Sequence, residues 1–101
     1  MSMTKIELFN AKNASKEISE GLVINVVGCG KYADVDKDGH DVVVSCLKDS
    51  NGDIYTTISG TVANSLDMLD DILADEKEVQ VEILKGTSNS GREFFKLMIR
   101  Q

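Results

Sequence analysis

One change in the spacing of apolar residues constrains the fold of this chain more than any other feature. Between residues 61 and 75 the apolar side chains recur every three or four positions, at Val62, Leu66, Leu69 and Leu73. This spacing predicts a single amphipathic helix, with Ser59 or Thr61 suited to cap its start. Its opposite face is acidic and carries Asp67, Asp70, Asp71 and Asp75.

On the N-terminal side of this helix the residues alternate as strands do. A β-branched run starts after Gly21 and is predicted to continue to Val35, with Gly28 and Gly30 marking a bulge or a sharp bend. Further strands are predicted at residues 41–47 and 54–59. The connections carry turn signals: residues 36–39 read Asp-Lys-Asp-Gly, and residues 50–53 contain Asn-Gly, a strong hairpin signal.

Two more strands are predicted after the helix, at residues 79–84 and 94–100, joined by a polar loop at 86–91. From Gly21 onward the predicted order is strand, strand, strand, helix, strand, strand. This is the chain order of the OB-fold, a five-stranded Greek-key β-barrel with its helix between the third and fourth strands. A small α+β sandwich has the same order of elements and remains an alternative.

The N-terminal segment is predicted to add an extension strand at residues 5–9, where Ile6 and Leu8 alternate with Glu7 and Phe9. Residues 10–20 are polar and predicted to be irregular, with one possible helical turn at 15–18. No repeat, low-complexity tract or proline divides the chain. We therefore expect residues 1–101 to form a single, mainly β, OB-like domain.

The composition excludes several classes of protein. The 101 residues are 42% hydrophobic and 28% charged, the balance of a globular chain rather than a disordered one. No apolar run approaches the roughly 20 residues that span a bilayer, and no signal peptide is recognisable. Cys29, Cys46 and His40 are too few for a structural zinc site, which normally needs four ligands. We expect a cytoplasmic protein with reduced thiols and no membrane association.

The sequence predicts no catalytic site, metal site or cofactor. It contains no nucleophile or phosphate-loop motif, and its adjacent acids lie on a solvated helix face. Residues 34–39 match the D-x-D-x-D-G opening of a calcium loop, but Ser45 stands where that loop needs a glutamate. A hairpin turn is therefore expected there. Weak Ca²⁺ binding by Asp34, Asp36 and Asp38 is the least favoured alternative.

Aromatic and basic residues favour a nucleic-acid role. OB barrels bind single strands by stacking bases on aromatic rings and placing Lys or Arg along the phosphates. Phe95 is in phase with the core, whereas Tyr55 is out of phase and is predicted to point away from it. The candidate stacking residues are Tyr55, Tyr32 and Phe94. The candidate phosphate contacts are Lys31, Lys48, Lys85, Arg92 and Lys96.

Three blocks carry a family likeness: residues 5–11, residues 52–59 followed by 61–63, and residues 85–97. The last is the most specific, because its Gly-Thr-Ser turn precedes paired aromatic residues. On these blocks the chain resembles the single-stranded DNA-binding proteins of small Bacillus-type tailed phages that replicate by protein priming. The resemblance implies an OB-type protein that coats and protects displaced strands during phage DNA replication in the infected bacterium. It implies tyrosine contacts, with Tyr55 the best match and Tyr32 the next.

The net charge of −6 leaves a second function open. The acidic side chains are concentrated in residues 67–78, whereas residues 85–101 are mildly basic. The expected partners are single-stranded DNA, phage replication proteins and further copies of the chain. The alternative is a protein–protein interaction module that docks a basic partner on the acidic helix face without binding nucleic acid.

Overall fold

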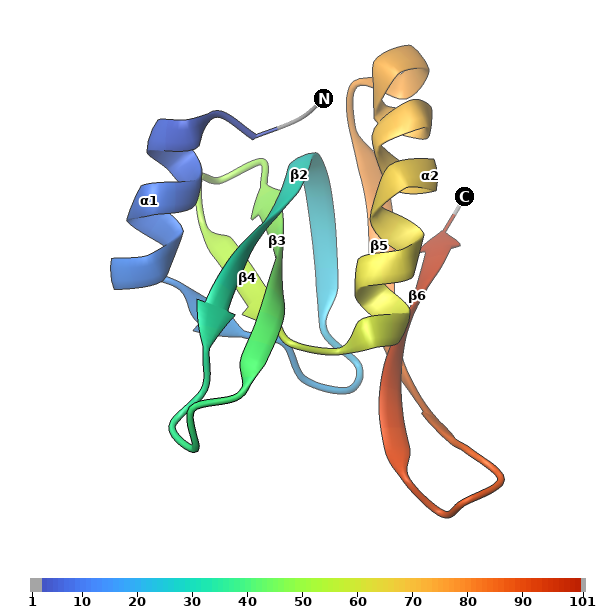
Figure 1. Ribbon diagram of the computed structural model, residues 1–101. Helices are drawn as coiled ribbons and strands as arrows, with labels where there is room; N and C mark the ends of the chain where they lie inside the picture. The colour runs from blue at the N-terminus through green and yellow to red at the C-terminus, as the bar shows by residue number, and fades with distance from the viewer. Residues whose placement is uncertain (1–2, 101) are drawn as a thin grey trace.

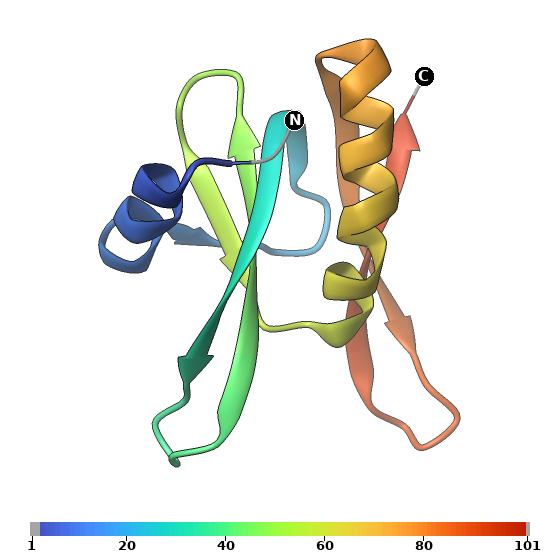
Figure 2. The same ribbon diagram turned by 45° about the horizontal axis from the view of Figure 1, so that its top comes forward.

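A strongly curved sheet of six strands carries one helix on each side in the computed structural model, which describes residues 3–100 (Figures 1 and 2). The elements in chain order are α1 (Lys5–Asn13), β1 (Lys16–Glu17), β2 (Val23–Val35), β3 (Asp41–Asp49), β4 (Ile54–Thr57), α2 (Gly60–Glu76), β5 (Val79–Thr87) and β6 (Glu93–Arg100). Neither helix of this part of the chain is long and apolar enough to cross a membrane.

The order of strands from β2 onward is the one predicted for an OB-like fold. Across the sheet the strands lie in the order β1-β4-β3-β2-β5-β6, with β1 parallel to β4 and every other pair antiparallel. Within residues 3–100 no ladder joins β4 to β6, so the barrel is open along this line, which we call the β4–β6 seam. One hydrogen bond crosses it: Ser59 Oγ donates to the carbonyl of Phe95 at 3.4 Å.

The predicted inner face of α2 is confirmed. Its four apolar residues are at most 4% exposed, and they pack on the concave face of the sheet in the main core. The sheet residues of this core include Ile24, Val26, Leu47, Val81 and Ile83. Burying each such side chain contributes roughly 1.5–3 kcal/mol, so this contact fixes α2 across the barrel. Ser59 occupies the N-cap position, but its hydroxyl is turned to Phe95 and does not cap the helix.

The bend predicted from the glycines of β2 is also confirmed. The register between β2 and β3 shifts between Val26 and Gly28, which is the mark of a β-bulge. At Gly30, a Cβ atom would lie 3.1 Å from Leu8 Cδ2 and 3.3 Å from Met3 Cβ. The missing side chain therefore lets the N-terminal residues lie close against β2.

The predicted strand at residues 5–9 is wrong, because this segment is the first part of helix α1. Thr4 and Glu7 form a capping box: Thr4 Oγ1 accepts from the Glu7 N–H at 3.1 Å, and Glu7 Oε1 accepts from the Thr4 N–H at 3.0 Å. Two alternating apolar residues are too short a pattern to outweigh such a start signal. Leu8 packs against a second core cluster, made of Met3, Ala11, Val44 and Cys46.

The irregular segment predicted at residues 10–20 is likewise partly regular. Helix α1 continues to Asn13, and β1 then pairs in parallel with β4, placing Lys16 beside Tyr55 and Glu17 beside Thr56. The next residue, Ile18, is buried in the main core. A two-residue strand has no periodicity of its own, so only its pairing with β4 defines it.

Cys29 and Cys46 are free and buried, one in each core cluster. Burial raises the pKa of each thiol to about 11. Both are therefore protonated at neutral pH, which makes them poor nucleophiles and poor metal ligands.

Candidate nucleic-acid interface

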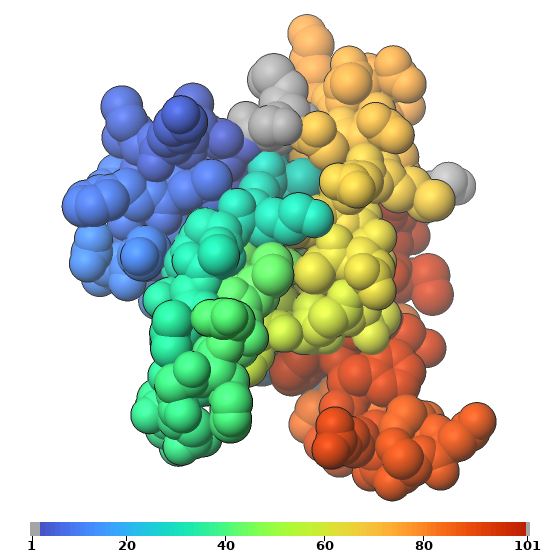
Figure 3. All heavy atoms as spheres, viewed as in Figure 1, coloured from blue at the N-terminus to red at the C-terminus, as the bar shows by residue number. Residues whose placement is uncertain are grey.

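Two hairpins, β2–β3 and β5–β6, extend beyond the curved sheet on the same side (Figure 1). Figure 3 shows them as separate projections with an opening between them. Two adjoining hollows lie there along the β4–β6 seam, and together we call them the inter-hairpin groove. One hollow is lined by Glu17, Ile18, Tyr32, Val44, Thr56, Thr57, Ile58 and Phe95. The other is lined by Thr57, Ile58, Ser59, Gly60, Thr61, Asn64, Glu93, Phe94 and Phe95.

Tyr32 enters this groove from the β2–β3 hairpin, where it pairs with Val44. Its ring is half-buried, and Lys12 Nζ lies 5.6 Å from the ring centroid, within the range of a cation–π contact. Burial is the main cause that raises the pKa of the Tyr32 hydroxyl. The phenol is thus uncharged at neutral pH, so its ring can approach a nucleic acid without repelling the phosphates.

Phe94 and Phe95 enter the groove from β6. Phe94 lies over Gly86 of β5, where a Cβ atom would come within 2.6 Å of Phe94 Cζ. Phe95, predicted as a core residue, does pack against the main core, and it also lines both hollows. Lys85 Nζ lies 5.7 Å from its ring centroid. Three half-buried aromatic rings therefore border the groove, contributed by both hairpins.

The prediction that Tyr55 points away from the core is wrong. Tyr55 is half-buried and packs against the main core, whereas Ile54 packs against the second core cluster on the other face of the sheet. Both faces of β4 are covered, so alternation along this strand does not separate a buried face from a solvated one. Tyr55 lines neither hollow of the groove, and its contact with bases stays a prediction.

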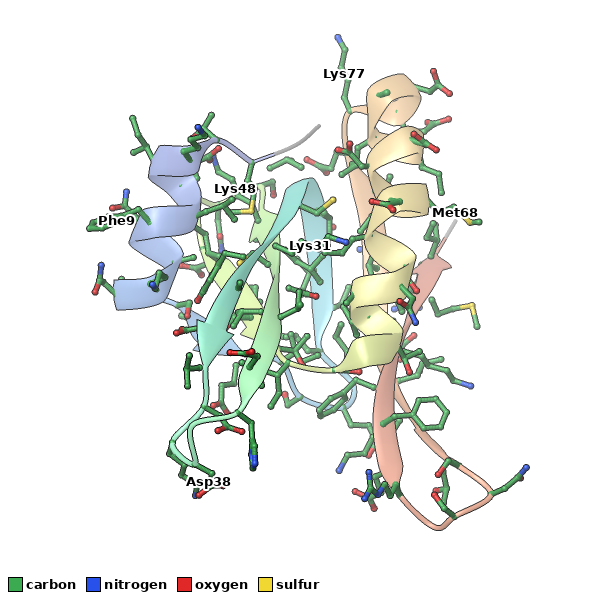
Figure 4. All side chains as sticks on the ribbon, viewed as in Figure 1. Phe9, Lys31, Asp38, Lys48, Met68 and Lys77 are labelled. Atoms are coloured by element: carbon green, nitrogen blue, oxygen red, sulfur yellow. The ribbon has the colours of Figure 1, made fainter. Side chains whose placement is uncertain are left out.

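The candidate cations fall into two groups. Lys31, Arg92 and Lys96 are exposed. Lys31 and Tyr32 lie on opposite faces of β2. Lys31 shares its face with Cys29, whose Sγ donates to the Leu66 carbonyl of α2. Figure 4 shows the Lys31 side chain extending toward α2. Arg92 and Lys96 belong to the β5–β6 hairpin. In the sequence, Arg92 precedes Phe94 and Phe95, and Lys96 follows them.

The other two cations are engaged by carboxylates. Lys85 Nζ lies 3.1 Å from Glu93 Oε2. Lys48 pairs with Glu7 of α1, and its hydrogen bond is the main cause that lowers the pKa of that carboxyl group. Lys48 lines a separate hollow beside α1, together with Lys16, Asp53 and Ile54. In this structure Lys48 therefore ties α1 to β3, away from the aromatic rings of the groove.

The turn between β2 and β3 brings Asp36, Asp38 and His40 together, with one potential ligand atom from each lying within 4.8 Å of the others. Asp36 Oδ1 accepts hydrogen bonds from the backbone N–H groups of Asp38 at 2.9 Å and His40 at 2.8 Å. Closing the turn accounts for the position of this carboxylate. The calcium-like sequence pattern is thus explained by turn geometry.

Lys12 beside the groove, and Val44 and Ile58 among its lining residues, are not among the site residues predicted from the sequence. Lys12 was assigned to an irregular segment, and its place four residues after Leu8 on a helix face emerges only once α1 is recognised. Val44 and Ile58 are apolar residues that the strand pattern assigns to the core. Ile58 is instead 62% exposed, because β4 ends at Thr57 and the chain turns toward α2.

The chain is similar to proteins named for binding single-stranded DNA. Residues 2–100 match the model of a family described as phage single-stranded DNA-binding protein. The single-stranded DNA-binding proteins of Bacillus phages PZA and phi29 are each 28% identical to this chain, and that of Bacillus phage B103 is 29% identical. Each alignment covers 94% of this chain and 84–85% of the relative. No solved structure matches the chain significantly.

A family match across nearly every residue includes both hairpins, the β4–β6 seam and the three rings of the groove. This chain belongs to the family of phage single-stranded DNA-binding proteins.

Proposed function

We propose that this protein binds single-stranded DNA without sequence preference in the inter-hairpin groove. The observation that carries the proposal is the placing of Tyr32, Phe94 and Phe95 along an open seam between two hairpins. Every base has a π-face, so stacking on such rings tolerates any sequence. A duplex presents its bases stacked and paired inside, so it cannot use these rings.

The charges around the groove support the same ligand. Lys12 and Lys85 lie over two of the rings, and Arg92 and Lys96 are exposed on the β5–β6 hairpin. These cations lie beside the groove, whereas Asp67, Asp71 and Asp75 are exposed on the solvated face of α2 and Asp70 is partly buried. We therefore expect moderate affinity for each copy of the chain and a strong dependence on salt.

In the phage, the protein coats the strands displaced during DNA replication, protects them from nucleases and removes their secondary structure. This role places it in the cytoplasm of the infected bacterium, alongside phage replication proteins as partners. It requires stoichiometric binding and no catalytic step, in keeping with a family named for binding single-stranded DNA.

Tyrosine fluorescence tests the proposal, because the chain has no tryptophan and only Tyr32 and Tyr55 emit. Titration of Tyr55→Phe with oligo(dT) reports on Tyr32 alone, and Tyr32→Phe reports on Tyr55 alone. We expect oligo(dT) to quench Tyr32 and duplex DNA to have little effect, and quenching of Tyr55 would show that bases also reach β4. Equal quenching by duplex would contradict the proposal, as would anisotropy showing no binding of oligo(dT) at low salt.

A further inference from the structure

Helix α1 exposes two large apolar side chains that its own fold leaves uncovered. Ile6 is 74% exposed and Phe9 is 66% exposed, and they lie three positions apart on the helix face turned away from the second core cluster. Lys5 lies four residues before Phe9 and borders this face with positive charge, whereas Lys12, three residues after Phe9, has its ammonium group over the Tyr32 ring. Glu7, the acid of this helix, is held by Lys48 on the inner side.

A second exposed apolar surface lies between α2 and β6. A hollow of about 230 Å³ is lined by Asn64, Ser65, Met68, Leu69, Ile72, Leu97 and Ile99. Met68 is 71% exposed and Ile99 is 38% exposed. The rim of this hollow on α2 is acidic, because Asp67, Asp71 and Asp75 are exposed on the neighbouring helix positions.

The two surfaces complement each other and lie on opposite sides of the molecule. Figure 4 shows Phe9 and Met68 pointing outward on opposite sides, with both hairpins between and below them. One surface is a convex apolar ridge with a basic border, and the other is an apolar hollow with an acidic rim. A contact of α1 with α1 would instead pair two surfaces that both carry Lys5 and no free acid, which disfavours a symmetric pairing.

We propose that copies of this protein associate head to tail, with the Ile6–Phe9 face of α1 in one copy docked in the α2–β6 hollow of the next. Such a heterologous contact uses the α1 face of one copy and the hollow of the next. Each copy keeps its other surface free, so further copies can join and form a chain. Both hairpins remain uncovered. Each surface is small, so free copies associate weakly, and copies bound to one strand meet at high effective concentration.

The cooperative consequence rests on the proposed function, but the contact itself does not. Two measurements therefore test it, one without DNA. In the first, amide NMR shifts of the wild-type protein are followed as its concentration is raised. We expect residues of α1 and of the α2–β6 hollow to shift together. Shifts confined to α1 would replace the head-to-tail contact with a symmetric one and overturn the proposal.

The second measurement compares binding to an oligo(dT) that holds one copy with binding to long poly(dT). We expect Phe9→Asp and Met68→Asp each to bind the short strand as the wild type does and to lose about tenfold or more of the gain on the long strand. Met98→Asp is the matched control, because Met98 is 51% exposed on the other face of β6. Far-UV circular dichroism checks that each variant is folded.

A charge exchange identifies the orientation. Lys5→Glu and Asp71→Lys should each weaken association, and the double variant should restore it, because both charges of the contact are then reversed. No concentration-dependent shifts together with no gain on poly(dT) would overturn the proposal. If amide NMR shifts appear at both surfaces but the protein binds no DNA, the contact between copies stands and the proposed function is refuted.

Discussion

The two hairpins that border the groove differ in charge and in support. The β2–β3 hairpin is acidic at its turn, with Asp34, Asp36, Asp38 and Asp41 near the tip, and it is backed by α1 and the second core cluster. The β5–β6 hairpin carries Lys85, Arg92 and Lys96 and projects past α2. Its loop is closed by its own bonds, including Ser88 N–H to the Arg92 carbonyl at 2.8 Å.

From this difference we expect the two sides of the proposed groove to act differently on a bound strand. Tyr32 of the β2–β3 hairpin packs against the second core cluster, which suits stacking, and the acidic tip of this hairpin should repel phosphates. The β5–β6 hairpin offers both rings and exposed cations. We therefore expect a bound strand to lie with its bases toward Tyr32 and its backbone toward Arg92 and Lys96.

Removing one ring from each hairpin should have the largest effect on binding. Tyr32→Ala and Phe94→Ala should each lower the affinity for oligo(dT) by roughly 5- to 150-fold, the equivalent of about 1–3 kcal/mol of stacking per base. Anisotropy titration measures the loss. Tyr32→Phe keeps the ring and should bind nearly as the wild type does; a large loss in this control would show that the hydroxyl, and not stacking, is what matters.

Neutralising the β5–β6 cations should have the next largest effect. Arg92→Ser and Lys96→Ser should each reduce the slope of log affinity against log salt by about 0.7, the value for one phosphate contact with a single strand. Lys37→Ser, in the acidic turn of the other hairpin, serves as the matched control and should leave the slope unchanged. Equal changes for all three variants would remove the distinction between the hairpins.

Neutralising the acidic tip should have a smaller, opposite effect. Asp38 is exposed and its side chain holds no turn bond among those described, whereas Asp36 closes the turn. Asp38→Asn should raise affinity for oligo(dT) by about twofold at low salt, and the gain should vanish at high salt because the repulsion is screened. A gain that persists at high salt would point to a direct contact and not to a long-range charge effect.

A last prediction concerns stability and not binding, through the support of the β2–β3 hairpin by α1. Pairing with Lys48 lowers the pKa of Glu7 in the folded state, so its stabilising contribution is present above the ordinary pKa of a glutamate. That contribution should be lost as the pH falls through the lowered pKa. Urea unfolding of Glu7→Gln should show a loss of about 1 kcal/mol or less at pH 7 and no difference from the wild type at the acidic end.

Long periodic segments made most of the fold predictable. The helical spacing of Val62, Leu66 and Leu69 and the Asn51-Gly52 turn each specify local structure without help from distant residues. Helix α1 was missed because its apolar residues lie on two sides, with Ile6 and Phe9 exposed and Leu8 turned inward. Such a helix has no clear apolar stripe, and its capping box is the only strong local signal.

The site was less predictable than the fold, for a related reason. Alternation tells which residues share a face of a strand, but it does not tell whether one or both faces are covered. Tyr55 was misplaced because both faces of β4 are packed. The placing of Tyr32 and Phe95 around one hollow depends on the curvature of the whole sheet, which no local pattern encodes.

The open β4–β6 seam affects how firmly a ligand can be held. In a closed barrel, moving two neighbouring hairpins apart breaks a ladder of backbone bonds. Here the described crossing is the single bond from Ser59 Oγ to the Phe95 carbonyl, which is already long at 3.4 Å. The two hairpins stay joined by the β2–β5 ladder and the main core, but no ladder fixes the width of the groove at this seam. We therefore expect one groove to accept purines and pyrimidines, which differ in width, along the same strand.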